Sequence, residues 1–208
     1  MSLRLAPRSR LSTIAIVAAA TAATAVPAAA QAAGTSGCPA VATSHPFAPW
    51  GDGASYLLAP DGGLEDGGSA WALAGGAAVS AGNESFKVGA ASDHASLTLP
   101  AGSTATTAPM CIGVEHKSMR FFVKSAARSR KAVLKVDVLY SDGAGKLRSR
   151  NIGRIAARQT WQATPILPLA VNRLARARGN AMAVSLRFTP QGGGFSIDDV
   201  YIDPWRTR

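Results

Sequence analysis

The clearest evidence for the fold is the stretch FSIDDVYID, residues 195–203. On either side of its Asp198-Asp199 step, apolar side chains recur at every second position, namely Phe195, Ile197, Val200 and Ile202. Alternation with a period of two is typical of a β-strand with one face in the core, and a break in the alternation indicates a β-bulge. We therefore predict a strand over residues 195–203 with a bulge at Asp198-Asp199.

The same alternation extends backwards through the second half of the chain. Residues 181–188 place four apolar side chains on one face, and residues 133–140 alternate around Lys135 and Asp137. Residues 120–124 form a further short apolar run. The turn-forming segment 141–145, followed by a restart at Lys146, predicts a hairpin. Gly192-Gly193-Gly194 lacks the Lys and Ser/Thr of a phosphate-binding loop, so we interpret it as a second hairpin turn.

The first half of the chain contains shorter strand candidates between Gly-rich turns. They are residues 55–59, 71–73, 77–80 and 96–99, and residues 104–114 with an interruption at Pro109. The best helix candidate is 169–178, which could equally be an irregular loop. Many short strands separated by turns predict an all-β fold, a β-sandwich with little helix.

Composition bounds the fold class further. The 208 residues are 47% hydrophobic but only 6% aromatic and 16% charged. This composition excludes a collagen-like repeat, a coiled coil and a charge-driven disordered chain, and the length suits one domain.

The first 32 residues have the organisation of a secretory signal peptide. Three arginines precede an Ala-rich apolar stretch over 11–26, Pro27 interrupts it, and Ala30-Gln31-Ala32 offers the small residues that signal peptidase requires. The alternative is an uncleaved membrane anchor. Such an anchor needs about 20 strongly apolar residues, whereas this stretch is Ala-rich and is interrupted by Pro27. We therefore expect a cleaved signal at 1–32, an N-terminal arm at 33–46 and a single β-sandwich domain at 47–208. The protein should be secreted, without a transmembrane segment after cleavage, and monomeric. The Ala-, Gly- and Arg-rich composition is associated with actinobacterial genomes.

Cys38 and Cys111 are the two cysteines. An even number in an exported chain predicts a disulfide, which would tie the N-terminal arm to the strand around Cys111. The alternatives are lipidation of Cys38 and free thiols, while two cysteines without a His cluster make a poor zinc site.

Charge is distributed unevenly along the chain. Residues 34–116 contain seven acidic residues and one basic residue, whereas residues 117–208 contain 18 basic residues and five acidic ones. This asymmetry can indicate an anionic partner, or the two halves can interleave in space and partly neutralise each other. We expect no specific nucleic-acid partner.

A family resemblance appears at both ends of the predicted domain. The opening FAPWGD (47–52), the segment GGLEDG (62–67) and Trp71 combine with the closing FSIDDVYIDP (195–204). Together they resemble the jelly-roll β-sandwiches of the galactose-binding-like and carbohydrate-binding-module type. The pattern also resembles a group of uncharacterised secreted actinobacterial proteins of this architecture. Leu64 departs from that pattern, which usually has an aromatic residue before the Glu.

The resemblance implies a calcium site. In such modules an early Glu and a late Asp often meet at a structural Ca²⁺, which here would use Glu65, Asp198 and Asp199. Calcium binds six to eight oxygen ligands, and Asp61, Asp66 and Asp93 could supply more of them. The alternative is that Asp198 and Asp199 cap a strand end or pair with arginines.

The function indicated by these features is a secreted, non-catalytic binding module for carbohydrate or cell-wall glycan. Aromatic rings stack on sugar faces, and Trp50, Trp161 and Trp205 lie beside turns or termini, although each could equally be a core residue. The resemblance places Trp71 in the core.

The first alternative is a cell-surface structural or interaction protein that binds anionic polymers through its basic C-terminal half. The second is a secreted hydrolase, for example one using Glu65 with Asp198. Neither a nucleophile elbow nor metal-ligand spacing of the histidines is present, so we assign no catalytic residue.

Overall fold

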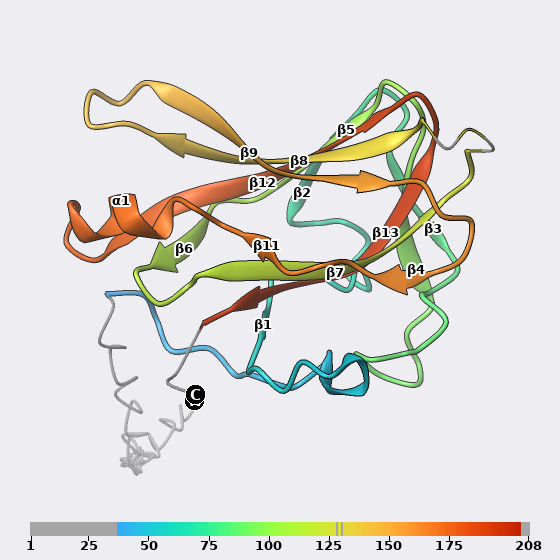
Figure 1. Cartoon of the computed structure of the whole chain (residues 1–208), viewed down its shortest axis with the longest axis horizontal. Helices are drawn as coiled ribbons and strands as arrows, with labels where there is room; N and C mark the ends of the chain where they lie inside the picture. Colours follow the sequence, from blue (N-terminus) through green and yellow to red (C-terminus); the bar gives the residue numbers. More distant parts are fainter. Residues whose placement is uncertain (1–36, 128, 130, 205–208) are drawn as a thin grey trace, which may run out of the picture. The chain divides into compact units, whose positions relative to one another are not determined.

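A computed structural model describes residues 37–127, 129 and 131–204 as a β-sandwich of two antiparallel sheets, with the jelly-roll architecture (Figure 1). These residues belong to one compact unit that spans 31–208. The predicted signal peptide at 1–32, and the start of the arm at 33–36, lie outside the described residues. No helix in the described part of the chain is long and apolar enough to cross a membrane.

Sheet 1 is built around the closing strand. β13 lies between β7 and β4, and it also pairs with the short strand β1, through Leu57 opposite Ile202. The strands of this sheet are β1 (Leu57–Leu58), β3 (Ala78–Ala81), β4 (Ala95–Leu99), β7 (Ser118–Ser125), β10 (Gln162–Ala163), β11 (Leu167–Pro168) and β13 (Phe195–Asp203).

Sheet 2 is built around β12, which pairs with β8, β5 and β6. Its strands are β2 (Trp71–Ala74), β5 (Thr104–Thr107), β6 (Met110–Gly113), β8 (Val133–Ser141), β9 (Leu147–Ala156) and β12 (Ala181–Gln191). The two helical segments are short: η1, a 3₁₀ turn (Ala48–Trp50), and α1 (Asn172–Arg176).

The main core lies between the two sheets. β12 alternates buried and less buried residues along its length, as expected for a strand with one face in the core. Phe121 from β7 meets Phe188 from β12 edge to face, with ring centroids 5.2 Å apart. Trp71 packs against Phe188 in this core, as predicted, and its indole N–H donates to the Asp61 carbonyl at 2.8 Å.

Most strand predictions are confirmed, and one local prediction is wrong. Residues 169–178, left open between a helix and an irregular loop, contain the five-residue helix α1. Gly192-Gly193-Gly194 is not a hairpin turn, because β12 and β13 belong to different sheets and do not pair. The glycines instead carry the chain across the sandwich, and Gly192 has a left-handed φ of 72° that favours glycine.

Residues 44–56 cover the outer face of sheet 1, so β7 is buried on nearly every residue. The cover is fastened by a buried polar network. Arg120 of β7 and the Tyr56 hydroxyl both donate to Asp52 Oδ2, at 2.9 and 2.7 Å. Burial alone would raise the pKa of Asp52, but the hydrogen bonds from Tyr56 and Arg120 outweigh it and lower that pKa. The Arg120 guanidinium also lies 4.4 Å from the Phe47 ring centroid.

The predicted disulfide is confirmed. Cys38 and Cys111 are bonded with Cα atoms 5.6 Å apart, and Cys111 lies in β6. The arm is therefore covalently attached to sheet 2, while the residues that follow it cover sheet 1.

Candidate functional site

The bulge predicted in the closing strand is present, and it turns Asp198 and Asp199 in different directions. The register of β13 against β7 shifts between Asp198 and Tyr201, and Asp199 has a positive φ of 50°. Both carboxylates are buried. Both faces of β13 are covered along this stretch, because every residue from Ile197 to Asp203 is buried.

The Asp198 side chain binds the backbone of a neighbouring loop. Its Oδ2 accepts the Glu84 N–H at 2.9 Å, and its Oδ1 accepts the Asp199 N–H at 2.9 Å. Glu84 is itself buried, and its carboxylate accepts the backbone N–H groups of Phe86 and Val88. Asp198 therefore positions the loop that carries Phe86.

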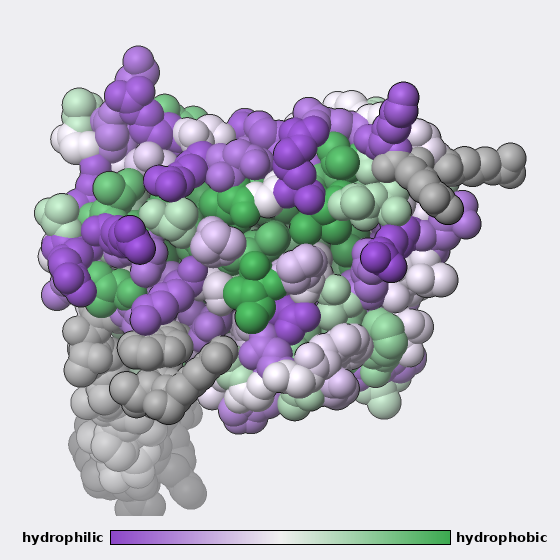
Figure 2. All heavy atoms as spheres, viewed as in Figure 1, coloured by the Kyte–Doolittle hydropathy of each residue, from purple (hydrophilic) through white to green (hydrophobic). Residues whose placement is uncertain are grey.

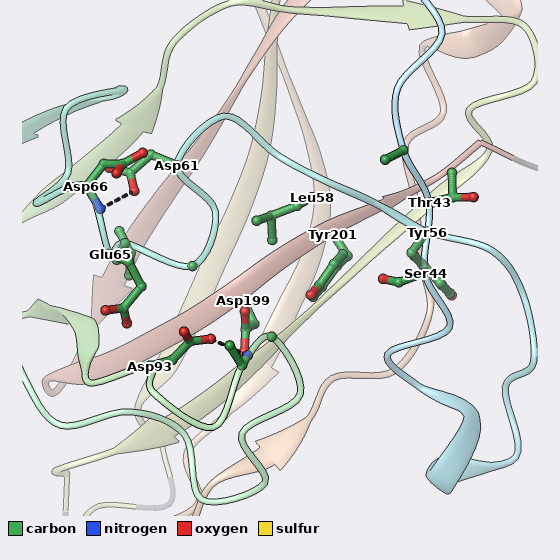
Figure 3. A pocket seen from close by; sticks show the side chains of 15 residues that line it. Thr43, Ser44, Tyr56, Leu58, Asp61, Glu65, Asp66, Asp93, Asp199 and Tyr201 are labelled. Carbon is green, nitrogen blue, oxygen red and sulfur yellow. Dashed lines mark hydrogen bonds between the residues drawn. The ribbon is translucent and has the colours of Figure 1, made fainter.

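Asp199 lines an acidic pocket, a hollow of about 450 Å³ between the start of the domain and β13 (Figure 3). Its lining includes five carboxylates, from Asp61, Glu65, Asp66, Asp93 and Asp199. Of the three predicted calcium ligands, Glu65 and Asp199 line this pocket and Asp198 does not. The Oδ2 atoms of Asp199 and Asp61 are buried without a hydrogen-bond partner.

Two glycines keep space in front of Asp199. A Cβ placed on Gly89 would lie 2.4 Å from Asp93 Oδ2 and 3.3 Å from Asp199 Oδ1. A Cβ on Gly63 would lie 3.5 Å from the same Asp199 oxygen. Asp93 and Asp199 thus converge on one small space, which Figure 3 shows at the base of the pocket.

The electrostatics of the bulge are unfavourable to two charged carboxylates. Burial, and then the neighbouring Asp199, raise the pKa of Asp198 to about 8. Burial, followed by the charges of Glu84, Asp93 and Glu65, raises the pKa of Asp199 to about 7. At neutral pH the bulge therefore favours a proton or a cation beside these oxygens.

The Glu65 carboxylate accepts hydrogen bonds from the backbone at the start of β4. Its Oε1 accepts the N–H groups of His94 and Ala95 at 2.8 and 2.9 Å, and its Oε2 lies 2.8 Å from the His94 ring. Among the described residues, no three His, Cys, Asp or Glu side chains are grouped closely enough to form a metal site by themselves.

A second feature, the aromatic platform, consists of Trp50, Phe86 and Trp161 on the outer face of sheet 1. Trp50 contacts Phe86 edge to face at 4.8 Å and Phe122 of β7 at 5.2 Å. Trp161 packs against the same Phe122-centred cluster, and Lys124 Nζ lies 4.7 Å from the centroid of its ring. Both tryptophans are half-buried, and Phe86 is 45% exposed.

Trp50 and Trp161, two of the three tryptophans predicted to bind ligand, belong to the platform. The third, Trp205, lies outside the described residues. Phe86 was not predicted from the sequence, because it stands alone between a polar stretch and Lys87 with no strand or helix period around it. Its only sequence signal is an isolated large aromatic residue in a Gly-, Asn- and Ser-rich loop.

The outer face of sheet 2 has a different character. Asp137 of β8 is buried there between Lys135, at 3.0 Å, and Arg187 of β12, at 3.6 Å, and Asn151 donates to it at 3.2 Å. Because these charged side chains pair with one another, we interpret them as a structural network rather than as a ligand site.

No protein-family model matches the sequence, and no curated protein matches it. Solved structures do show similarity. One is a family 61 carbohydrate-binding module in complex with β-1,4-galactotriose, which is 16% identical, with 72% of this chain and 98% of that chain covered and a TM-score of 0.40. A CBM22 xylan-binding domain from Paenibacillus barcinonensis is 18% identical, with coverage of 72% and 94% and a TM-score of 0.46.

A third is a family 11 carbohydrate-binding module from Clostridium thermocellum in complex with a β-1,3-1,4-mixed-linked tetrasaccharide. It is 12% identical, with 71% of this chain and 94% of that chain covered and a TM-score of 0.44. All three are carbohydrate-binding modules, and the chain is similar to them as a β-sandwich.

Proposed function

We propose that the protein is a secreted, non-catalytic module that binds carbohydrate through the aromatic platform. The observation that carries this proposal is the grouping of Trp50, Phe86 and Trp161 on the surface of sheet 1, outside the inter-sheet core. A protein that needed these rings only for stability would gain most by burying them between the sheets.

The chemistry of the platform suits a pyranose chain. Ring faces of tryptophan pack on the apolar C–H faces of sugars, while polar groups at the edge bind hydroxyls. Lys124 lies beside Trp161 and can donate hydrogen bonds to hydroxyl groups. The platform is held from below by Phe122 and from the side by the loop that Asp198 and Glu84 fasten. Such prior ordering lowers the entropic cost of binding.

Titration calorimetry with soluble β-1,4-galactan, xylan and mixed-linkage glucan tests the proposal. Trp161→Ala should weaken binding of the recognised glycan at least about tenfold, since one lost stacking contact is worth about 1–3 kcal/mol in comparable aromatic sites. Trp161→Phe should restore part of the affinity. Ile166→Ala removes an apolar side chain that is 50% exposed and lies outside the platform, so it should bind like the wild type. Equal affinity in the Trp161→Ala and Ile166→Ala variants would exclude the platform as the site.

A non-catalytic function is supported by the placement of the carboxylates. Glu65 is bound to backbone N–H groups, and Asp198 does not line the pocket in which Glu65 lies, so the pair lacks the shared cleft that glycoside hydrolysis requires. Hydrolysis of a bound glycan that disappears in Glu65→Gln would overturn this part of the proposal.

We also propose that the acidic pocket binds Ca²⁺ as a structural ion. The donors fit: they are hard carboxylate oxygens, two of them are buried without a partner, and Gly89 and Gly63 leave room beside Asp199. Because no three of these carboxylates are grouped closely enough to form the site by themselves, Asp199 and Asp93, which face one small space, would hold the ion, and carbonyls and water would complete its shell. The ion would neutralise carboxylates that otherwise repel one another.

Thermal unfolding with calcium and with chelator tests the ion. Because Ca²⁺ would bind only the folded state, a hundredfold excess over Kd should add about 2.7 kcal/mol to the free energy of unfolding. Magnesium should substitute poorly, since it requires a rigid octahedral shell. Asp199→Asn should erase the calcium effect, whereas Asp66→Asn, at an exposed pocket position, should retain most of it. Coincident melting curves with calcium and with chelator would refute the site.

A further inference from the structure

A second hollow, the basic groove, lies at the end of the sandwich where α1 packs on β6 and β12 (Figure 1). It shares no lining residue with the acidic pocket or the aromatic platform. Its volume is about 960 Å³, and it is lined by Val114, Lys117, Arg150, Pro168, Ala170, Asn172, Arg173, Leu174 and Arg176. In Figure 2, hydrophilic and hydrophobic residues intermingle over this end of the molecule.

Charge sets this groove apart from the rest of the surface. Four of its lining residues are cationic and none is acidic. Elsewhere the basic side chains of Arg120, Arg148 and Arg187 pair with aspartates. Within the described residues, by contrast, the side chains of Arg150, Arg173 and Arg176 form no ion pair with an acidic group. These three guanidinium groups repel one another and destabilise the fold, so an anion would be bound favourably here.

The groove is assembled by the fold from distant parts of the chain. Arg173 and Arg176 are three positions apart on α1 and therefore lie on one side of it, while Arg150 comes from β9 and Lys117 precedes β7. The chain enters α1 through Ala170, whose left-handed φ of 60° bends the backbone at the wall of the groove. Several guanidinium groups along one hollow can each bind an oxyanion in a two-pronged manner.

The remaining wall of the groove is apolar. Val114, Pro168 and Leu174 contribute it, and Leu174 is 38% exposed. A ligand that matches the whole groove therefore carries anionic groups and apolar faces in the same repeating unit. Polysaccharides that contain uronic acids have this character, because each pyranose ring has a C–H face beside its carboxylate. Poly(glycerol phosphate) lacks the ring, and proteins bind single-stranded nucleic acids by stacking their bases on aromatic side chains, none of which lines this groove.

We propose that the basic groove binds the carboxylates of an acidic, uronate-containing polysaccharide, as a second glycan site besides the aromatic platform. This inference rests on the proposed function in that it takes the partner to be a glycan. It specifies the substrate class: a polymer that carries both neutral stretches for the platform and anionic units for the groove.

Calorimetry and salt titration of the full chain with polygalacturonate test the inference. The double variant Arg173→Gln/Arg176→Gln should weaken binding at least about tenfold and flatten its salt dependence, because two charge-assisted contacts are lost. The matched control Arg154→Gln/Arg158→Gln removes two exposed guanidinium groups outside the groove and should bind like the wild type. The groove double variant should be at least as thermally stable as the wild type, because it removes repulsion between the groove cations.

The outcomes separate this inference from the proposed function. Loss of polygalacturonate binding in the groove variant, with neutral glycan binding intact, supports the groove whether or not Trp161→Ala affects neutral glycans. Equal loss in both double variants would mean a diffuse charge effect and overturn the inference. Tighter binding of poly(glycerol phosphate) or single-stranded DNA than of polygalacturonate would also overturn it. Loss of neutral glycan binding in Trp161→Ala alone bears only on the platform.

Discussion

At Gly62, the loop after β1 approaches the closing strand more closely than any side chain permits. The Val200 N–H donates to the Gly62 carbonyl at 3.0 Å, and a Cβ on Gly62 would lie 2.6 Å from the Val200 carbonyl oxygen. The atom in the way belongs to the backbone of β13, so it cannot swing aside as a flexible side chain would. Glycine here allows the segment that carries Asp61 and Glu65 to dock beside the bulge.

Gly62→Ala should therefore destabilise the protein by about 1–3 kcal/mol, the usual cost of forcing extra atoms into a packed site. Chemical denaturation measures the free energy of unfolding. Gly53→Ala is the matched control, because Gly53 has nothing within 4 Å of its Cβ position. It should be neutral or slightly stabilising, since alanine restricts the unfolded chain. Similar losses in the two variants would show that the approach to Val200 is not the cause.

At the scale of single elements, β13 both organises sheet 1 and contributes Asp199 to the acidic pocket. It pairs with β7, β4 and β1, yet its bulge holds two buried carboxylates whose pKa values are raised. Because Asp199 has a pKa of about 7 when folded and an ordinary value of 3.8, the folded state holds the extra proton across the range between these two values. This contribution to stability is fully present below about pH 4, declines as pH rises, and is lost above the folded pKa.

We predict that, in chelator, the melting temperature of the wild type relative to Asp199→Asn falls as pH rises from about 4 to 8. Asparagine cannot ionise, so the variant lacks this decline. Calcium at neutral or alkaline pH should restore the wild type but not the variant. Comparing the two proteins removes the opposite pH effects of Asp52 and of His116, whose pKa is lowered mainly by burial. A constant difference between the two proteins over this pH range would contradict the prediction.

The strands of the second half could be predicted because each has one face in the core and so a period of two. The hairpin between β8 and β9 also follows from local turn chemistry. Gly192-Gly193-Gly194 was misinterpreted because a glycine turn looks the same whether the next strand pairs or crosses to the other sheet. Trp50 and Trp161 are predicted from the sequence as ligand-binding residues, but the contact of Trp50 with Phe86 is not, because it depends on backbone hydrogen bonds to Glu84 and Asp198.

At the scale of the whole molecule, the N-terminal arm links both sheets. Cys38 is bonded to β6 of sheet 2, and residues 44–56 cover sheet 1 with Phe47, Trp50 and Tyr56. The acidic pocket has the end of the arm as one wall, since Thr43 and Ser44 line it. Loosening the arm should therefore affect the pocket and the platform together.

The disulfide spans 73 positions, and closing a loop of this length stabilises a fold by about 4 kcal/mol. Cys38→Ser/Cys111→Ser should lower the free energy of unfolding by about that amount and weaken glycan binding, because Trp50 follows the arm. The wild type in reducing agent should match the double variant. In oxidising conditions its intact mass should be about 2 Da below that of the reduced form. A double variant as stable as the oxidised wild type would show that the arm docks without its covalent tie.

The central place of β13 also has a consequence for the timing of folding. Sheet 1 cannot close until residues 195–203 have been synthesised, because β7 and β4 meet only through that strand (Figure 1). Contacts between such distant segments form slowly, so β7 and β4 should remain without their shared partner until residues 195–203 have left the ribosome.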